Sequence, residues 1–440
     1  MRRSLQGTSL PVLLLAAYFL QTCKSTPSAD ANESVHADSL IVETPDLPVL
    51  QLTSGQRQHW FGYYDKYQID PTGRFALVMQ VDTFLRSPTE RDTLKIGMID
   101  LANGNQWREI GTSTAWGWQQ GCMLQWIPGS SDEVIWNDRE GDRFISRIYN
   151  VETGKMRILP KAIYALSLDG SFAVGTEFSR IQNMRPGYGY PGIADPYEED
   201  KAPSESGIYK MDLKTGTSRL MISLRDIAGV PNDDGPISDK YFHYFNHLLV
   251  SPDSKRFIFL HRYRDKKPVP GSSGGGFITR MFTANVDGTE KFMLDPSGKT
   301  SHFIWKDPQH VTAWTEPAGH PAGFYEFRDQ TNEIKLIGHE AMPVNGHNTY
   351  VPNTANEWIL NDTYPDKNDR HQTLYLYHVP TNRKVVLGRF YEPPQFQGEW
   401  RCDLHPRISR DGRRVFFDST HEGDKRQLYS IDISSIVFEE

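Results

Sequence analysis

Short segments in which aromatic and β-branched residues alternate with polar ones recur along most of the chain. Each leads through a turn rich in Pro, Asp and Gly into a second apolar segment, which is the pattern of a two-stranded β-hairpin. Helical periodicity is nearly absent. Seven such hairpins can be identified, at residues 61–79, 122–138, 163–177, 247–262, 302–314, 347–362 and 403–419.

Most of these hairpins are followed by a third strand that ends in another turn signal. Examples are 96–106, 146–156, 207–220, 280–291 and 373–384. A hairpin, a third strand and a fourth strand after the second turn make up one blade of a β-propeller. The repeat therefore predicts an all-β fold, a single β-propeller of seven blades with four antiparallel strands each. Six or eight blades stay open as alternatives because the repeat is weak.

The final blade ends after QLYSIDI, one strand short. Residues 46–54 (DLPVLQLTS) precede the first hairpin and can supply that strand, so that an N-terminal strand closes the ring and removes the open sheet edges. We therefore expect one propeller domain over residues 45–440. Before it we expect a signal peptide over residues 1–22 and a flexible polar tether over residues 23–44.

The first residues have the features of an export signal. Arg2 and Arg3 precede an apolar stretch, Leu10–Leu20, that is too short to span a bilayer. Cys23 stands where a bacterial lipoprotein is cleaved and lipidated, although the two residues before it are not the usual small ones, so simple secretion stays open. The sequence predicts an exported protein, either periplasmic or an outer-membrane lipoprotein that contacts the membrane only through its lipid.

The composition limits the classes of partner and the disulfide bonds that can be expected. A formal net charge of −7 argues against nucleic acid, because phosphate binding needs a clustered positive field. Beyond Cys23 the cysteines are Cys122 and Cys402, each at the start of an apolar strand. A small buried thiol is the more common outcome at such positions, and a disulfide between the two is the alternative.

Two irregular loops interrupt the repeat. Residues 178–206 are surplus between the third and fourth hairpins and are rich in Gly, Pro, Tyr and Arg, and residues 264–277 combine basic residues with a glycine run. Long loops on a rigid ring commonly carry binding function. Arg180, Arg185 and Tyr188 are therefore predicted to bind substrate as part of a lid, with a solvated loop as the alternative.

The innermost strands of the blades should begin at one mouth of the central channel. Their first residues are Tyr64 or Asp65, Gln119 or Gln120, Tyr164, His247, His302, His347, and Asp403 with His405. Histidine dominates the last four blades although the protein has only 14. Together with Gln397, the residues His302, His347, Asp403 and His405 would suit a divalent metal, first Mn²⁺, with Ca²⁺ or Zn²⁺ as further possibilities. For any single histidine, a hydrogen-bonded structural role is the alternative.

Neighbouring residues suit a sugar acid. Asp403 and His405 are two positions apart on a strand and face the same side, as does Arg401, whose planar guanidinium could clamp a carboxylate unless it is a surface ion pair. His59 and Gln120 accompany aromatic residues before the first two hairpins. Aromatic faces and amides suit sugar binding, and ordinary packing between blades is the alternative.

Four segments resemble oligogalacturonate lyase, the propeller enzymes of polysaccharide lyase family 22. They are NHLLVSPDSKRFIFLH (246–261), SHFIWKDPQH (301–310), GHNTYVPN (346–353) and DLHPRISRDGRRVFFDSTHEG (403–423). TolB-like propellers share the DG–strand portion. The resemblance covers the C-terminal half, and it implies a propeller enzyme that uses a metal to cleave a uronic-acid glycan.

By this resemblance His247 matches the catalytic base, and His302 and His405 match two metal ligands. The chain departs from the family at three positions: the third ligand histidine falls on Asp403, the ligand glutamine on Trp400 with Gln397 near, and the catalytic arginine on Gly207. The departures favour a uronic-acid polysaccharide other than pectin oligomers.

We therefore expect metal-assisted β-elimination on an acidic glycan. A metal and Arg401 would neutralise the sugar carboxylate, His247 would remove the neighbouring proton, and Tyr64 or Tyr188 would protonate the leaving oxygen. Two alternatives stay open: a glycoside hydrolase that uses carboxylates such as Asp65 and Asp403, and a non-catalytic propeller that binds a glycan or a protein. The oligomeric state is not predicted.

Overall fold

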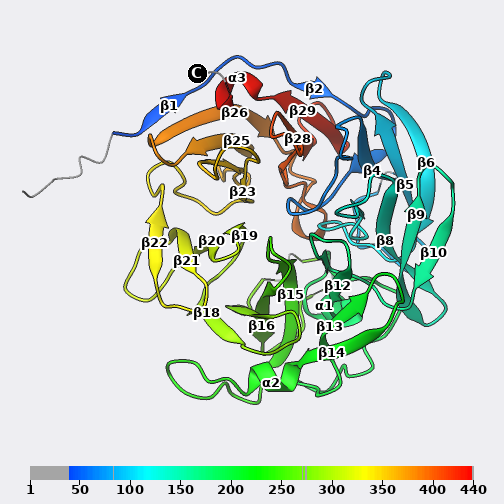
Figure 1. The fold of residues 1–440 in the computed structure, drawn as a ribbon, viewed down its shortest axis with the longest axis vertical. Helices are drawn as coiled ribbons and strands as arrows, with labels where there is room; N and C mark the ends of the chain where they lie inside the picture. Colours follow the sequence, from blue (N-terminus) through cyan, green and yellow to red (C-terminus); the bar gives the residue numbers. More distant parts are fainter. Residues whose placement is uncertain (1–38, 83, 270, 273–274, 439–440) are drawn as a thin grey trace, which may run out of the picture. The chain divides into compact units, whose positions relative to one another are not determined.

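The computed structural model describes residues 39–438 apart from residues 83, 270, 273 and 274. Within them the chain forms seven antiparallel sheets that follow one another around a ring (Figure 1). This confirms the predicted seven-bladed propeller. The predicted signal peptide, the lipidation site at Cys23 and most of the tether lie outside the described residues. None of the described helices is long and apolar enough to cross a membrane.

The first three blades contain four strands each, ordered from the axis outward. Blade 1 consists of β3 (Gln58–Trp60), β4 (Phe75–Val81), β5 (Leu94–Asp100) and β6 (Gln106–Ser113). Blade 2 consists of β7 (Gln125–Trp126), β8 (Glu133–Glu140), β9 (Arg143–Asn150) and β10 (Met156–Leu159). Blade 3 consists of β11 (Ala165–Leu166), β12 (Phe172–Gly175), β13 (Gly207–Asp212) and β14 (Ser218–Ser223), with α1 (Phe178–Met184) inserted and α2 (Leu224–Ala228) following.

The next two blades repeat this order. Blade 4 consists of β15 (Phe242–Val250), β16 (Arg256–Arg264), β17 (Ile278–Asn285) and β18 (Phe292–Gly298). Blade 5 consists of β19 (Phe303–Asp307), β20 (His310–Thr315), β21 (Gly323–Arg328) and β22 (Ile334–Ile337).

The last two blades each receive a strand from the N-terminal segment. Blade 6 consists of β23 (Thr349–Tyr350), β24 (Trp358–Asn361), β25 (His371–His378) and β26 (Arg383–Tyr391), with β1 (Ile41–Glu43) parallel to β26. Blade 7 consists of β27 (Arg407–Ile408), β28 (Arg414–Ser419) and β29 (Gln427–Asp432), with β2 (Leu50–Gln51) antiparallel to β29. The short helices η1 (Gly398–Trp400) and α3 (Ser434–Val437) complete the described elements.

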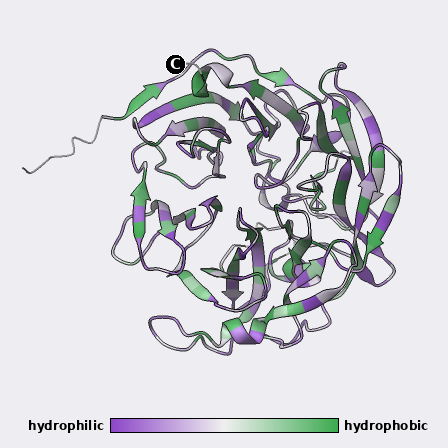
Figure 2. Cartoon of the chain, viewed as in Figure 1, coloured by the Kyte–Doolittle hydropathy of each residue, from purple (hydrophilic) through white to green (hydrophobic). Residues whose placement is uncertain are grey.

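The hydrophobic core lies between neighbouring blades, as the alternation in the sequence requires. In β16 all nine positions are buried, and the two faces pack into different clusters. Phe257 and Phe259 join a cluster shared with blade 3, whereas Ile258 and Leu260 join a cluster shared with blade 5. In outer strands such as β10, more exposed and less exposed side chains alternate. Figure 2 shows hydrophobic (green) and hydrophilic (purple) residues in turn along the strands at the rim.

The predicted closing strand is confirmed. β2 lies inside residues 46–54, and Leu50 and Gln51 pair with Ser430 and Tyr429 of the C-terminal blade. The pairing continues beyond the strand, because Leu52 N–H donates to the Leu428 carbonyl at 2.8 Å. The sequence did not predict β1, which extends blade 6 and is fixed by an ion pair of Glu43 with Arg383 at 2.7 Å.

The two cysteines of the described chain are free and buried, as expected for structural thiols. Burial raises the pKa of both the Cys122 and the Cys402 thiol. Both therefore stay protonated and unreactive at neutral pH.

The closure can be tested by shortening the chain. Compared with a chain that begins at Ser39, one that begins at Gly55 lacks β1 and β2. We expect it to lose roughly 3–6 kcal/mol of unfolding free energy, from backbone hydrogen bonds at about 1 kcal/mol each and from the burial of Leu52 at about 2 kcal/mol. A chain that begins at Asp46 keeps β2 and should lose less. Equal denaturant midpoints for all three chains would show that the closing strand does not stabilise the ring.

Candidate functional site

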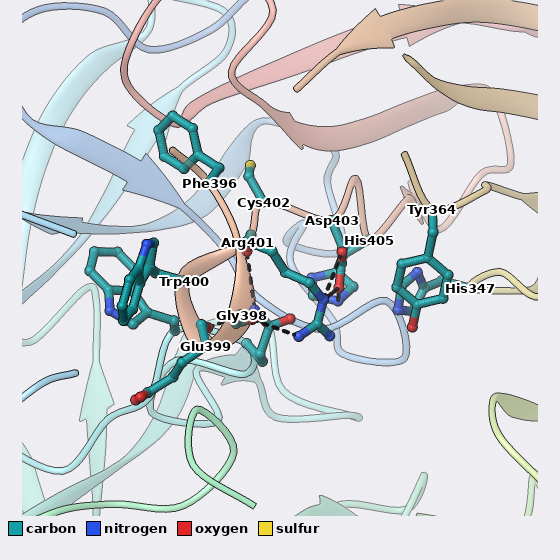
Figure 3. A network of polar contacts seen from close by, with 12 residues as sticks. His347, Tyr364, Phe396, Gly398, Glu399, Trp400, Arg401, Cys402, Asp403 and His405 are labelled. Carbon is teal, nitrogen blue, oxygen red and sulfur yellow. Dashed lines mark hydrogen bonds and ion pairs between the residues drawn. The ribbon is translucent and has the colours of Figure 1, made fainter. Parts of the chain in front are cut away.

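Three side chains meet at the channel: His347, Asp403 and His405. One ligand atom of each lies within 4.8 Å of the others, and all three residues are at most 3% exposed. His347 lies just before β23, and Asp403 and His405 lie just before β27, so two neighbouring blades bring these residues together. Figure 3 shows Asp403 and His405 side by side, with His347 and Tyr364 facing them.

The two imidazoles present unused nitrogens. Nε2 of His347 and Nε2 of His405 are buried and have no hydrogen-bond partner among the described residues. Asp362 accepts from Nδ1 of His347 at 3.0 Å, which fixes the tautomer and leaves Nε2 as a lone-pair donor. Burial and the neighbouring His347 hold the pKa of His405 well below its ordinary value, so that ring is neutral. Burial lowers the pKa of His347, but the Asp362 carboxylate outweighs it and raises that pKa above its ordinary value. Two imidazoles and a carboxylate fit a divalent cation, which would bind His347 in its deprotonated form.

His302 and Gln397 lie outside this set. The His302 ring is 4.1 Å from the His347 ring, but its Nδ1 is 3.0 Å from the side-chain oxygen of Asn345 and its Nε2 is 3.4 Å from the Tyr364 hydroxyl. Gln397 is exposed just before η1, so it does not reach the cluster. Of the predicted metal-binding residues, His347, Asp403 and His405 come together, whereas His302 and Gln397 do not join them.

An arginine and tyrosine group adjoins these three candidate metal ligands. Arg401 contacts the Asp403 carboxylate at 2.9 Å (Figure 3). It also donates to the Tyr188 hydroxyl at 2.8 Å. Arg185, which follows α1, also donates to Tyr188 at 3.2 Å. Burial raises the pKa of Tyr188, but the charges of Arg401 and Arg185 outweigh it and lower the pKa to about 7.

Arg185 has N–H groups that no described residue uses. Its guanidinium lies 4.3 Å from the centre of the Tyr188 ring and 4.6 Å from that of Phe277, so it is held between two aromatic faces. Its Nε and one terminal nitrogen are buried and have no hydrogen-bond partner within the described chain. The predicted loop residues Arg185 and Tyr188 thus reach the site, and Arg185 presents two N–H groups suited to a carboxylate.

His247 lies on the channel side of β15 because the strand is irregular there. The pairing of β15 with β16 shifts register between Asn246 and Leu248, and His247 has a left-handed φ of 49°. Its Nε2 lies 3.1 Å from the Asp65 carboxylate, which orients the ring. Burial lowers the pKa of His247 to about 4, even though Asp65 raises it, so the imidazole is neutral above that pH. The Tyr63 ring connects it to the metal-ligating residues, 4.9 Å from the His247 ring and 5.2 Å from the His405 ring.

The Tyr64 hydroxyl, predicted as a possible proton donor, is engaged by the backbone of a neighbouring blade. Its hydroxyl donates to the Phe303 carbonyl at 2.8 Å and accepts from the Phe303 N–H at 3.1 Å. Burial also raises its pKa well above the ordinary value. A hydroxyl with both interactions used in this way fixes one blade to another and has no proton to give to a substrate.

Two predicted substrate-binding residues have structural surroundings instead. Arg180 is 1% exposed, and its five N–H groups bind Asp195 and four backbone carbonyls, so it organises the inserted loop. His59 bonds to Gln427 and Gln80 in a groove between β2 and β6, outside the channel site. Gln120 does lie in the channel, where its side-chain oxygen accepts from the Tyr164 hydroxyl at 2.9 Å.

Sequence reasoning missed Asp362 and Tyr364. Both follow β24, the strand that pairs with β23 behind His347. The polar sequence NDTY after the apolar WIL is the one signal that could have drawn attention to them.

Comparisons with known proteins support the fold. No protein-family model matches the sequence, and no curated protein matches it. Among solved structures, oligogalacturonate lyase from Vibrio parahaemolyticus matches with a TM-score of 0.60 at 14% identity, over 88% of this chain and 94% of that one. An oligogalacturonate lyase in complex with manganese matches with a TM-score of 0.58 at 14% identity, over 88% and 93%. A prolyl endopeptidase matches with a TM-score of 0.50 at 10% identity, over 86% of this chain and 49% of that one.

The fold and site define a seven-bladed β-propeller with a buried His–Asp–His cluster in its channel. The predicted resemblance to oligogalacturonate lyase is confirmed for the fold. At 14% identity the likeness defines the architecture and leaves the chemistry to the site residues.

The metal-ligating residues can be tested by metal content. We expect the purified protein to bind one equivalent of a divalent ion, and His347→Ala and His405→Ala each to abolish it, because each removes a ligand. His302→Ala should weaken binding by about 10–100-fold at most, as the loss of an outer-shell contact does. Mass-spectrometric metal analysis after dialysis makes the comparison, and full loss in His302→Ala with retention in His347→Ala would exclude this ligand set.

Proposed function

We propose that the protein is a carbohydrate-active lyase that cleaves a uronic-acid-containing oligo- or polysaccharide by metal-assisted β-elimination. The observation that supports this most is the placement of a cation-binding set, His347, Asp403 and His405, beside two arginines. Arg185 retains free buried N–H groups there. A site of this kind suits a substrate that carries a carboxylate next to the reacting carbon.

The positive charges of the site would act on the carboxylate of the substrate. A divalent ion held by His347, Asp403 and His405 would supply positive charge that stabilises the carboxylate as the neighbouring carbon loses its proton. Arg185 would bind the other carboxylate oxygen through its unused N–H groups, and Arg401 would hold Asp403 in its orientation. Mn²⁺ is the metal we propose, in keeping with the imidazole and carboxylate donors and with the manganese complex of one structural neighbour.

Proton transfer falls to His247 and Tyr188. His247 is neutral above about pH 4, and Asp65 holds its Nε2, so Nδ1 is the atom that would accept the proton. Tyr188 would donate its hydroxyl proton to the leaving oxygen, and its pKa of about 7 suits both loss and recovery of that proton near neutral pH. Tyr188 replaces Tyr64, whose hydroxyl is committed to Phe303.

The hydrolase alternative finds less support. Hydrolysis needs one protonated carboxyl group as an acid. Burial raises the pKa of Asp65, but Lys66 and His247 outweigh it and lower the pKa to about 2. Asp403 is ion-paired with Arg401. Asp65 would therefore not hold a proton at neutral pH, and Asp403 is engaged by a cation. We also propose that the substrate is an acidic glycan and that the protein is exported.

Turnover on uronate oligosaccharides tests the proposal. Cleavage by elimination creates an unsaturated uronate that absorbs in the ultraviolet, and His347→Ala should lose this signal by at least about 100-fold, as expected when a stabilising charge is removed. Sugar release without ultraviolet absorbance would point to hydrolysis. Binding of the glycan that persists unchanged in His247→Ala, with no turnover of any substrate, would point to a non-catalytic propeller.

The pH profile distinguishes the proton donor. Activity should fall on the acid side as His247 gains a proton near pH 4, and on the alkaline side as Tyr188 loses its proton near pH 7. Tyr188→Phe should lower kcat by about 10²–10⁴-fold and remove the alkaline fall. Tyr64→Phe is the matched control: it should lower thermal stability and keep the profile. An unchanged alkaline fall in Tyr188→Phe would assign that ionisation to another group.

A further inference from the structure

The channel has a second mouth with a pocket of its own. A cavity of about 280 Å³ is lined by one or more residues of every blade, among them Gln125, Leu166, Leu249, Ile304, Tyr350 and Ile408. In four blades these residues follow the histidines of the first site along the same inner strand, as Tyr350 follows His347 and Ile408 follows His405. The pocket therefore lies farther down the channel.

Tyr64 separates the two regions. It lines the pocket, and its ring also contacts the rings of His302 and His347, at 5.9 and 5.3 Å. Because its hydroxyl is bonded to the Phe303 backbone, the ring is fixed in place. The pocket is thus distinct from the site that holds the metal-ligating residues.

The pocket carries an excess of positive charge. Lys66, Lys306 and Arg410 line it, whereas Asp65 is the one acid among its described lining residues. The Lys66 ammonium is 3% exposed, lies 2.9 Å from the Asp65 carboxylate and makes no hydrogen bond within the described chain. Lys306 is committed to Glu326 at 2.6 Å. Lys66 thus already balances Asp65. Asp70, outside the pocket lining, acts on Arg410 electrostatically but makes no hydrogen bond to its Nε or to one of its terminal nitrogens.

Arg410 is the lining residue best suited to bind an anion. Its guanidinium lies 5.0 Å from the centre of the Tyr67 ring, and its Nε and one terminal nitrogen are buried without a hydrogen-bond partner in the described chain. A buried donor without an acceptor destabilises the protein unless a ligand supplies one. Two N–H groups of one guanidinium are the geometry that binds a carboxylate through both oxygens.

Most of the remaining wall is apolar, with Gln125, Thr349 and Asn356 as its polar members. Leu166, Leu249, Ile304 and Ile408 face the cavity together with Trp305. The volume is at the lower end of the range for small-molecule sites. We propose that this pocket binds a small organic carboxylate, with its carboxylate on Arg410 and Lys66 and its apolar body against these side chains.

Such a ligand would act on a residue that the first site also uses. Asp65 holds Lys66 with one oxygen and His247 with the other, at 2.9 and 3.1 Å. A carboxylate on Lys66 competes with Asp65 for the ammonium. The pocket is therefore placed to influence how His247 is held, whether or not the first site proves to be a lyase.

Calorimetry on the full chain tests the pocket directly, with benzoate as the probe. We expect one equivalent of benzoate to bind, and benzamide, which has the same shape without the charge, to bind at least about 10-fold more weakly. Arg410→Gln should weaken benzoate binding by at least about 10-fold. Arg413→Gln is the matched control, because Arg413 is exposed on the same turn and should leave the affinity unchanged.

Each other outcome has a definite meaning. No benzoate binding to the unaltered protein at millimolar concentration overturns the proposal, as does equal binding to Arg410→Gln. Inorganic phosphate that binds as tightly as benzoate, and is lost in Arg410→Gln, would show a simple anion site and overturn the role of the apolar wall. Thermal unfolding of each variant without ligand shows whether it is folded, and Arg410→Lys, which keeps the charge, serves if Arg410→Gln is not.

Discussion

The hydrogen bonds between β2 and β29 join the two ends of the ring, and the position of every inner strand depends on them. A propeller blade has little core of its own and buries its faces against its two neighbours, as β16 does with blades 3 and 5. If blade 7 were free at its outer edge, its contact with blade 1 would depend on side chains and on the backbone hydrogen bond from His59 N–H to the Arg426 carbonyl at 2.9 Å. The closing strand makes that junction covalently continuous with the first blade, so seven inner strands converge on one axis.

That convergence buries many ionisable groups around the axis, and most of them are paired. Asp362 binds His347, Arg401 binds Asp403, and Asp65 is shared by Lys66 and His247. Burial of a charge is expensive unless a partner is present. The groups left without one are therefore informative: Nε2 of His347 and of His405 can accept a cation, and the N–H groups of Arg185 and Arg410 can bind anions.

The repeat of hairpins predicted the blades and the closing strand because turn residues and alternation are local features. It also placed histidines at one end of the inner strands. It could not decide between His302 and His347, because the difference rests on which ring nitrogens the neighbours Asn345 and Asp362 occupy. Arg180 and Arg185 look alike in the sequence. The N–H groups of Arg180 are bound by carbonyl groups such as that of Asp200, whereas two nitrogens of Arg185 have no partner among the described residues. The left-handed backbone of His247 and His405, which turns both rings into the channel, has no sequence signature.

The N-terminal segment pairs with blades 6 and 7, and these same blades supply His347, Asp403 and His405. A cation shared by these residues would cross-link the two blades at the axis, while β1 and β2 connect them at the circumference. Opening of the ring and loss of the ion are then linked equilibria, since a displaced blade 7 carries two of the three ligands away. Removal of the ion by a chelator would thus leave blades 6 and 7 joined only through β1 and β2. The fraction of protein that holds the ion would then report how stable the ring closure is.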